Sequence, residues 1–493
     1  METPEIDYSR KWFVLSAVGM GIFLATIDGS IVNVALPTLA EDLSASFALV
    51  QWVVLAYLLT ITTLMLSFGR YADMIGKKPI YVTGFAVFTV GSVLCGLAPN
   101  VQWLIGFRVL QAVGAAMLMA LGMAIITEAF PPQERGRALG ISGAIVSIGI
   151  VLGPTLGGLI IKQFSWHWIF FVNLPVGVAG TWMARRYVPA IRPEGGQKFD
   201  FVGALTLLLG LLAFLLGLTL GPDWGFADGR VLGLLAAAAF FLGLFVFAET
   251  RVEQPMVDLR LFRNSLFTIN LATGFISFIS IAGTLILMPF YLENVLGYAT
   301  DQVGLLLAVV PISLGLTAPI SGSLSDRYGS RPITMIGLAV LTAGFLAVRT
   351  ISVDTTAVGY VLRFLPVGLG LGIFQSPNNS AIMGTAPRRR LGIVSGMLAI
   401  TRTLGQTTGI AILGAVWSSR VFYHAGQVLP AGATTAPAAD QVAGLQDTFL
   451  LVVVLVFLGF VLATWALIEE RRQQRAGLAG QPAAPVSAPD IKR

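Results

Sequence analysis

Two residues of opposite charge stand inside apolar segments of the sequence. Asp28 is 16 residues into the apolar run 12–34, and Arg108 is six residues into the run 102–125. At about 1.5 Å per residue of helix, they lie about 24 Å and 9 Å along their segments. If the two helices are antiparallel, both side chains reach compatible depths. The spacing therefore predicts that Asp28 and Arg108 meet.

A carboxyl group in this position can do chemistry with protons. A charge at mid-membrane costs about 2.5–3.5 kcal/mol on insertion scales, and a buried carboxyl group favours taking up a proton. Asp28 can then exchange protons with whichever side of the membrane the cavity faces. Arg108 lowers the pKa of Asp28 when it is close and no longer does so when it is distant. One alternative is a permanent ion pair that only joins two helices. Another is an Arg108 bonded to helix carbonyls or to Gln111, and the residues alone do not decide.

The rest of the sequence offers little other site chemistry. There is one cysteine, Cys95, and the two histidines, His167 and His424, are far apart. A single thiol excludes an internal disulfide and a cysteine-based metal site, and the histidine spacing is not that of metal ligands. No P-loop and no nucleophile–base constellation is present. We expect no enzyme, no metal and no cofactor, with the proton gradient as the energy source.

Composition predicts the class of protein that must position these residues. The chain has 493 residues, of which 11% are charged and 56% hydrophobic, and its mean hydropathy is +0.82. A soluble domain has about 25% charged residues, so an all-α integral membrane protein is expected. The net charge of +6 is explained by basic cytoplasmic loops rather than by nucleic acid.

Fourteen apolar segments are long enough to cross a membrane as helices. Transmembrane β-strands are excluded, because they are about ten residues long and alternate strictly. The expected spans are 12–34, 48–69, 79–97, 102–125, 137–161, 167–187, 201–220, 231–249, 267–292, 303–324, 333–350, 358–379, 395–417 and 448–468.

Basic residues predict the orientation of these spans. With the N-terminus inside, 24 of the 31 Lys and Arg residues are cytoplasmic, four are outside and three are within spans. This bias places both termini in the cytoplasm. The first span continues past Asp28 to Pro37, so no cleavable signal is expected. We expect a multi-pass protein of the cytoplasmic (inner) membrane, a loose outer loop at 421–447 and a disordered tail from 476.

Two pairs of features recur at nearly the same offset. Asp73 in the segment 69–78 matches Asp326 in the segment 322–331, at an offset of 253, and Arg108 matches Arg363, at an offset of 255. These repeats predict two homologous six-span halves, which suits a rocking transporter with its site between them. The expected divisions are a first half at 1–199, two inserted spans at 200–264, a second half at 265–475 and a tail at 476–493.

Five segments then resemble one family in the order that the family shows. The sequence resembles the major facilitator superfamily, and in particular its fourteen-span drug:proton antiporter branch of multidrug efflux proteins. Position 167 is a departure, because Arg is more usual there than His, and the role of that turn stays open. The segments are Ile27–Pro37, Gly69–Lys78, Arg108–Ala116, Gly149–Gly158 and Trp166–Gly177.

The resemblance implies roles for two groups of residues. One group closes the inner gate against the opposite half. The alternative is that its aspartates are only solvated turn residues. The members of this group are Gly69, Asp73, Gly76, Lys77, Asp326 and Arg327. The other is the helix-5 motif associated with exporters, in which small residues permit close helix contact and proline bends the helix. Its members are Gly149, Gly153, Pro154, Gly157 and Gly158, and their alternative role is ordinary packing.

Substrate contacts are expected from aromatic and lightly polar residues, because drug sites combine these types. Such residues on membrane helices also pack or face lipid. The candidates are Asn33, Gln51, Trp52, Tyr57, Gln111, Phe275, Phe278, Gln375, Asn378 and Asn379. Arg363 is interpreted as structural, and Arg402 as a residue that extends to the cytoplasmic boundary.

The sequence as a whole predicts a proton-coupled antiporter that exports drugs or other small amphipathic molecules by alternating access. Its expected partners are the small-molecule substrate, protons and lipids, without nucleic acid, and we expect a monomer. The alternatives are a dedicated exporter of one metabolite, lipid or antibiotic, an uptake symporter, and a membrane enzyme or receptor.

Overall fold

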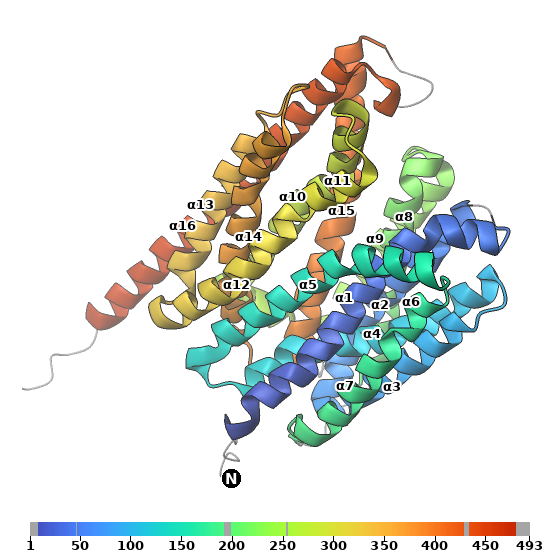
Figure 1. The fold of residues 1–493 in the computed structure, drawn as a ribbon. Helices are drawn as coiled ribbons and strands as arrows, with labels where there is room; N and C mark the ends of the chain where they lie inside the picture. Colours follow the sequence, from blue (N-terminus) through green and yellow to red (C-terminus); the bar gives the residue numbers. More distant parts are fainter. Residues whose placement is uncertain (1–7, 46, 192–198, 253–254, 428–432, 480–493) are drawn as a thin grey trace, which may run out of the picture.

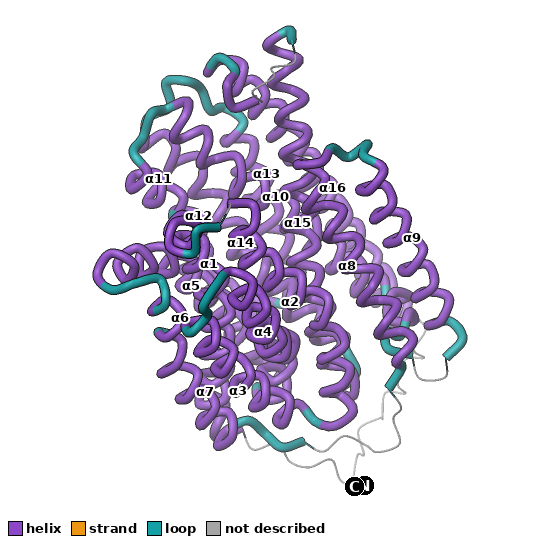
Figure 2. The backbone as a smooth tube through the Cα atoms, turned by 90° about the vertical axis from the view of Figure 1, so that its right-hand side faces the viewer, coloured by secondary structure: helices purple, strands orange, loops and turns teal. Residues whose placement is uncertain are grey.

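A chain this apolar must satisfy its backbone hydrogen bonds internally, which favours helices throughout. The computed structural model describes residues 8–45, 47–191, 199–252, 255–427 and 433–479. These residues form helices joined by short loops and contain no strand (Figure 2).

The helices follow one another along the chain with short connections. The α-helices are α1 (Lys11–Asp42), α2 (Phe47–Ile75), α3 (Lys77–Gly96), α4 (Val101–Ala129), α5 (Arg135–Gln163), α6 (Trp168–Phe171), α7 (Asn173–Tyr187), α8 (Phe201–Trp224), α9 (Gly229–Glu249), α10 (Ser265–Phe290), α11 (Thr300–Leu307), α12 (Val309–Tyr328), α13 (Ser330–Val348), α14 (Ala357–Thr385), α15 (Leu391–Ala425) and α16 (Ala438–Ala479). Single turns add η1 (Tyr8–Arg10), η2 (Pro132–Glu134), η3 (Leu259–Arg263), η4 (Tyr291–Val295), η5 (Arg388–Arg390) and η6 (Ala433–Thr435).

The helices form two groups. In Figure 1 the blue to teal helices α1–α7 form one group and the yellow to red helices α10–α16 the other. Within the first group α1 packs on α4, α5 and α7, and within the second α10 packs on α14, α15 and α16. The groups meet along two seams, in which α5 lies against α12 and α2 against α15. We call them the N-terminal and C-terminal halves.

Glycine makes the same turn in both halves. Gly76 separates α2 from α3 with φ 104°, and Gly329 separates α12 from α13 with φ 88°. A side chain is strained at such angles, whereas glycine adopts them readily. The two positions differ by the offset of 253 that relates Asp73 to Asp326, so the repeat extends to backbone geometry. We call the end of the molecule that carries these turns the basic end.

The inserted helices α8 and α9 form an antiparallel pair beside the α2–α15 seam. They pack on each other, and α8 also contacts α2 and α15. The Asp200 carboxylate caps α8 by accepting the Gly203 N–H at 2.8 Å. Glu249, at the end of α9, accepts the Val257 N–H at 2.9 Å and so holds the following linker. The insert therefore covers one side of the contact between the halves.

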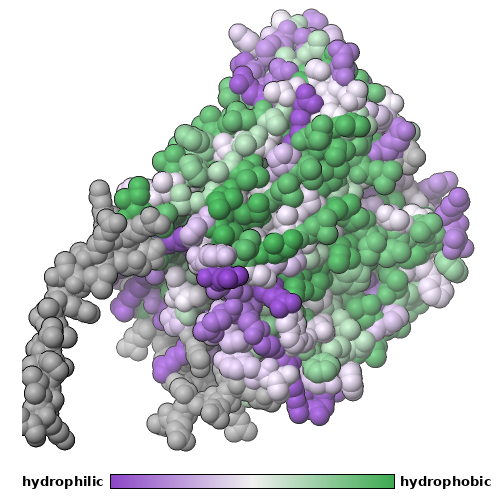
Figure 3. Space-filling view, turned by 60° about the vertical axis from the view of Figure 1, so that its left-hand side comes forward, coloured by the Kyte–Doolittle hydropathy of each residue, from purple (hydrophilic) through white to green (hydrophobic). Residues whose placement is uncertain are grey.

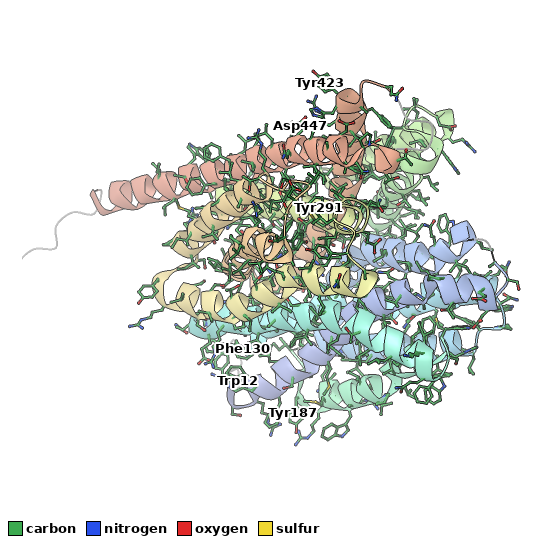
Figure 4. All side chains as sticks on the ribbon, turned by 45° about the horizontal axis from the view of Figure 1, so that its top comes forward. Trp12, Phe130, Tyr187, Tyr291, Tyr423 and Asp447 are labelled. Atoms are coloured by element: carbon green, nitrogen blue, oxygen red, sulfur yellow. The ribbon has the colours of Figure 1, made fainter. Side chains whose placement is uncertain are left out.

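An apolar band crosses the surface of the molecule. Figure 3 shows a broad hydrophobic band between hydrophilic ends. Aromatic side chains mark both ends: in Figure 4, Trp12, Phe130 and Tyr187 lie at the basic end of the N-terminal half, and Tyr423 lies with Asp447 at the opposite end of the C-terminal half. Trp12 contacts Phe130 edge-on at 5.4 Å between ring centroids. This is the distribution expected of a protein in a bilayer.

Twelve of the described helices are long and apolar enough to cross a membrane. The expected span 167–187 is broken at Val172 into α6 and α7, and α7 has only 15 residues. The expected span 395–417 lies in α15, which has 35 residues but places Thr, Arg and Gln in its middle. The count of fourteen spans therefore stays a prediction.

Two expected irregular regions are helical in part. The segment 421–447 was expected to be a loose loop, but α15 continues to Ala425 and α16 begins at Ala438. The tail was expected to start at 476, whereas α16 extends to Ala479. Helix-forming Ala, Leu and Gln in these stretches explain the difference. Residues 428–432 and 480–493 lie outside the described residues.

Candidate functional site

Asp28 is fully buried and surrounded by hydrogen-bond donors. Its Oδ2 accepts from Arg108 Nη1 at 2.5 Å, and its Oδ1 accepts from Gln111 Nε2 at 2.8 Å and from Asn173 Nδ2 at 3.0 Å. All four side chains are 0–1% exposed. Helices α1, α4 and α7 thus meet at one carboxylate. The expected meeting of Asp28 with Arg108 is present, and both oxygens of the acid are occupied.

Arg108 also makes the contacts that were considered as alternatives to the ion pair. Its Nε donates to the Val53 carbonyl at 3.0 Å, and its Nη1 donates to Gln111 Oε1 at 2.7 Å. The guanidinium lies over the Tyr57 ring, 4.0 Å from the centroid. Its Nη2 is buried without a hydrogen-bond partner. The arginine therefore joins α4 to α1 and α2 together, and one of its donors stays free.

Ser92 and Asn173 also belong to this hydrogen-bond network, although neither was predicted from the sequence. Ser92 Oγ accepts from Gln111 at 3.2 Å and from Asn173 at 3.0 Å, and donates to the Phe170 carbonyl at 2.9 Å. Asn173 belongs to the segment Trp166–Gly177, whose role was left open. A polar residue at the start of a helix in that segment was the signal available. Asn173 thus connects the segment Trp166–Gly177 to Asp28.

The helix-5 glycines position the helix that carries Asp28. A Cβ on Gly149 would lie 2.9 Å from Thr26, and one on Gly157 would lie 2.8 Å from Ile31. Gly153 faces Ser30 in the same way, and Ser30 Oγ donates to the Gly149 carbonyl at 3.0 Å. Small residues four apart thus let α5 approach α1 closely.

Two other members of the helix-5 motif do not make this contact. Gly158 has no neighbour within 4 Å of a built Cβ, and Pro154 is exposed. The close packing of α5 on α1 therefore rests on Gly149, Gly153 and Gly157.

Asp73 connects the halves at the basic end. Its two oxygens accept the backbone N–H groups of Gly392 and Ile393, both at 2.9 Å. These are among the first N–H groups of α15, which have no partner within the helix, and the positive end of the helix dipole favours the charge. Lys77 lies 3.1 Å from Asp73 and 2.9 Å from Glu128. A carboxylate of one half therefore caps a helix of the other.

Asp326 makes the corresponding contact in the opposite direction. It accepts the N–H groups of Gly136 at 2.7 Å and Arg137 at 2.8 Å, at the start of α5. Ser376 Oγ adds a bond to the Gly136 carbonyl at 2.9 Å. Arg327 lies over the neighbouring Tyr328 ring instead, 5.4 Å from its centroid. The aspartates are thus bound across the seam, and the alternative of solvated turn residues is wrong.

The capped helix starts were missed, although they carry a repeat of their own. Each has proline, then glycine five residues on, then glycine nine residues on: Pro131, Gly136 and Gly140 in one half, and Pro387, Gly392 and Gly396 in the other. A Cβ on Gly136 would lie 2.5 Å from the Gly322 carbonyl oxygen, and one on Gly392 would lie 2.5 Å from that of Gly69. The glycines let the backbones touch.

A surface ion pair supports the start of α15. Arg390, which precedes the helix, pairs with Asp258 in the linker after α9. Burial acts to raise the pKa of Asp258, but the Arg260 N–H at 2.9 Å and the Arg390 guanidinium outweigh it and hold that pKa below its usual value. The linker of the inserted helices is thus attached to the same contact region.

The substrate candidates lie on five different helices, α1, α2, α4, α10 and α14. Gln111 bonds to Asp28 and Tyr57 lies against Arg108, so both belong to the group of buried residues around Asp28, which we call the Asp28 cluster. Asn378 donates to the Asn270 carbonyl at 3.1 Å and so joins α14 to α10. Asn33 is exposed and donates to the Gly29 carbonyl within its own helix. Six others are partly buried: Gln51, Trp52, Phe275, Phe278, Gln375 and Asn379.

The two remaining arginines of the expected spans differ from Arg108. Arg363, its repeat equivalent, donates to Thr350 Oγ1 at 2.9 Å and to the Gly359 carbonyl at 2.9 Å, in accordance with a structural role. Arg402 lies in the middle of α15.

Comparison with known proteins identifies the family. The Major Facilitator Superfamily model matches residues 18–410. The chain belongs to the major facilitator superfamily. The superfamily consists of transporters rather than enzymes, and several relatives are named multidrug transporters. Among solved structures, the human organic anion transporter MFSD10 (TETRAN) has the same fold, with a TM-score of 0.66, 16% identity and coverage of 94% of this chain and 100% of that one.

Three bacterial relatives illustrate the range of names within the superfamily. The riboflavin transporter RibZ of Clostridioides difficile is 35% identical, over 84% of this chain and 90% of its own length. The multidrug transporter MdtP of Bacillus subtilis is 31% identical, over 85% and 77%. The multidrug resistance protein Stp of Mycobacterium tuberculosis is 36% identical, over 82% and 75%.

Proposed function

We propose that this chain is a proton-coupled antiporter that exports drugs or other small amphipathic molecules across the cytoplasmic membrane. The observation that carries the proposal is the Asp28 carboxylate, 0% exposed and held by donors from three residues. A buried ionisable group in a membrane transporter is a site of proton relay by default. The protein needs no cofactor, because the proton gradient supplies the energy.

Proton binding and helix movement are coupled at this carboxylate. Both Asp28 oxygens accept N–H bonds in the present structure, so an incoming proton competes with Arg108 on one oxygen and with Gln111 and Asn173 on the other. Protonation therefore loosens α1 from α4 and α7. Because α5 is packed on α1 through its glycines, α5 moves with it, and α5 forms one of the two seams.

The orientation in the membrane follows from the charge distribution. In the sequence, 24 of the 31 Lys and Arg residues fall in segments on the same side as the N-terminus, which makes that side, and with it the basic end, cytoplasmic, with both termini inside and fourteen spans in all. The Asp73 and Asp326 contacts then close the path on the cytoplasmic side. Each proton entering with the membrane potential releases about 2.3 kcal/mol per 100 mV, enough for a gradient of roughly 50-fold. A single copy contains both halves and is the functional unit.

Reconstituted transport tests the proposal. We expect purified protein in liposomes to move amphipathic dyes against their gradient when a pH gradient is imposed, and added dye to dissipate that gradient. Asp28→Asn removes the titratable group but keeps a side chain of the same shape. It should abolish uphill movement and keep downhill exchange.

Asp42→Asn is the matched control, because Asp42 ends the same helix and is exposed. It should transport as the unaltered protein does. Proton-dependent accumulation by the Asp28→Asn protein would show that another group couples transport.

A dedicated exporter of one metabolite is the second candidate. It is favoured by the similarity to a protein named as a riboflavin transporter, at 35% identity over 84% of this chain. Competition among dyes separates the two. A multidrug exporter is inhibited by many unrelated dyes, whereas a dedicated one responds to a single compound such as riboflavin.

A further inference from the structure

An arginine without a counter-charge lies in the middle of the C-terminal half. Arg402 belongs to α15, and among the described residues no hydrogen bond or ion pair engages it. Asp28 is not available, because Arg108 neutralises it. An unpaired charge at membrane depth is costly and marks a functional position.

The depth of Arg402 is that of the Asp28 cluster. Gly396 on α15 faces Met65 on α2. Arg402 is six residues beyond Gly396, about 9 Å further from the basic end. Tyr57, which stacks on Arg108, is eight residues from Met65 in the same direction, about 12 Å. The two arginines of the two halves are therefore at nearly the same level.

The expectation that Arg402 extends to the cytoplasmic boundary does not fit this placement. It is 12 residues beyond Arg390, which precedes α15, and this corresponds to about 18 Å. Snorkelling brings the charge of a long side chain to an interface only near the end of a helix. The guanidinium therefore stays within the membrane region.

Arg402 lies on the side of α15 that turns toward α10. It keeps partial exposure, whereas Arg108 and Tyr57 are 0–1% exposed. On α15, Gly396 points to α2 and Gly405 to Phe275 and Phe278 of α10. At about 100° per residue, Arg402 lies on the flank between these contacts, within about 60° of the Gly405 direction.

The same flank carries further polar groups. Ser395 and Gln406 lie within about 40° of Arg402 around the helix. Ser395 is 1% exposed, and its Oγ has no hydrogen-bond partner among the described residues. A cation with polar neighbours beside the aromatic rings of α10 has the composition of a site for an amphipathic ligand.

We propose that Arg402 binds the acidic group of an amphipathic anionic substrate, such as a carboxylate, sulfonate or phosphate. The proposal rests on the export function above and specifies its substrate class. The guanidinium forms paired hydrogen bonds with planar and tetrahedral anions, and the aromatic residues of α10 contact the apolar part. Because anion exit and proton entry move charge in the same direction, exchange is electrogenic.

Binding of two dyes with the same ring system tests this without a pH gradient. Fluorescein is anionic and rhodamine 6G is cationic, and both have a xanthene core. For purified full-length protein in detergent, we expect Arg402→Gln to weaken fluorescein binding about tenfold or more and to leave rhodamine 6G binding unchanged. Arg402→Lys keeps the charge and should retain most of the fluorescein affinity. Arg363→Gln, a partnered arginine of the same half, is the control and should change neither.

Other outcomes overturn the proposal. These are failure of the unaltered protein to bind fluorescein, equal losses for both dyes, and an effect of Arg363→Gln as large as that of Arg402→Gln. Displacement of fluorescein by phosphatidylglycerol would assign Arg402 to a lipid headgroup instead.

Folding is checked by melting temperature, which should rise in Arg402→Gln because an unpaired charge is removed. Failure of proton coupling would appear with Asp28→Asn in liposomes and not in these binding constants.

Discussion

The two halves use their repeated aspartates in the same way and their repeated arginines in different ways. Asp73 and Asp326 each cap a helix of the opposite half through two backbone N–H groups. Arg108 and Arg363 occupy equivalent positions, but Arg108 is buried with Asp28, whereas Arg363 bonds to a neighbouring loop and to its own helix. Closure is thus shared between the halves, while among the described residues the fully buried ion pair is found in the N-terminal half.

Removing the two arginines should separate their roles most strongly. Arg108→Gln leaves a buried carboxylate without its cation, and we expect a loss of about 3–5 kcal/mol in the free energy of unfolding. Arg363→Gln should cost about 1 kcal/mol. Unfolding in detergent measures both. Combining Arg108→Gln with Asp28→Asn should recover much of the stability, and equal losses for the two single variants would contradict the asymmetry.

Alanine at the seam glycines should open the basic end. In Gly136→Ala and Gly392→Ala the added Cβ meets a carbonyl oxygen 2.5 Å away, so we expect the closed state to lose about 1–3 kcal/mol. Spin labels at the exposed Ile75 and Leu324, in a Cys95→Ser background, report the separation of the halves. Gly158→Ala, with no neighbour within 4 Å, is the control and should not change that separation.

Neutralising the gate aspartates should have a somewhat smaller effect. Asp73→Asn and Asp326→Asn each lose the charge and one of two bonds to a helix start, which costs about 1–2 kcal/mol. Asp73→Asn should open the labelled pair further, because Asp73 also contacts Lys77. A closed distance distribution in the double variant would contradict the role of these contacts.

Acid should weaken the ion pair beside α15 only slightly. The pKa of Asp258 is lowered in the folded protein, so its contribution is present above about pH 4 and is lost as pH falls through the lowered value. We expect Asp258→Asn to cost about 0.5–1 kcal/mol at pH 7 and less at pH 2.5. Melting temperatures of both proteins across this range measure the difference, and a constant difference would exclude this linkage.

The sequence predicted the features that have a strong local cause. A charge in an apolar run and a recurring Gly/Asp segment were enough to predict that Asp28 meets Arg108 and that Asp73 and Asp326 correspond. The backbone donors to those aspartates were missed, because N–H groups leave no mark of residue type. Only the spacing of proline and glycine around Gly136 and Gly392 signals them.

Other errors come from packing across distant segments. Asn173 joins Asp28 because α7 happens to lie against α1, and no spacing along the chain encodes that contact. Arg402 was placed near the boundary from its position in an apolar run alone, whereas the start of α15 at Leu391 sets its depth. The substrate candidates were chosen by residue type, which does not report direction, and they are scattered over several helices.

The use of main-chain groups by Asp73 and Asp326 sets the energy scale of opening. When the halves part, water takes over the freed N–H groups and carboxylates, so each contact contributes only about 1 kcal/mol net. Two such contacts bias the closed form by roughly 30-fold. One bound substrate or one proton can reverse a preference of that size, and the transporter is thereby kept within reach of both of its states.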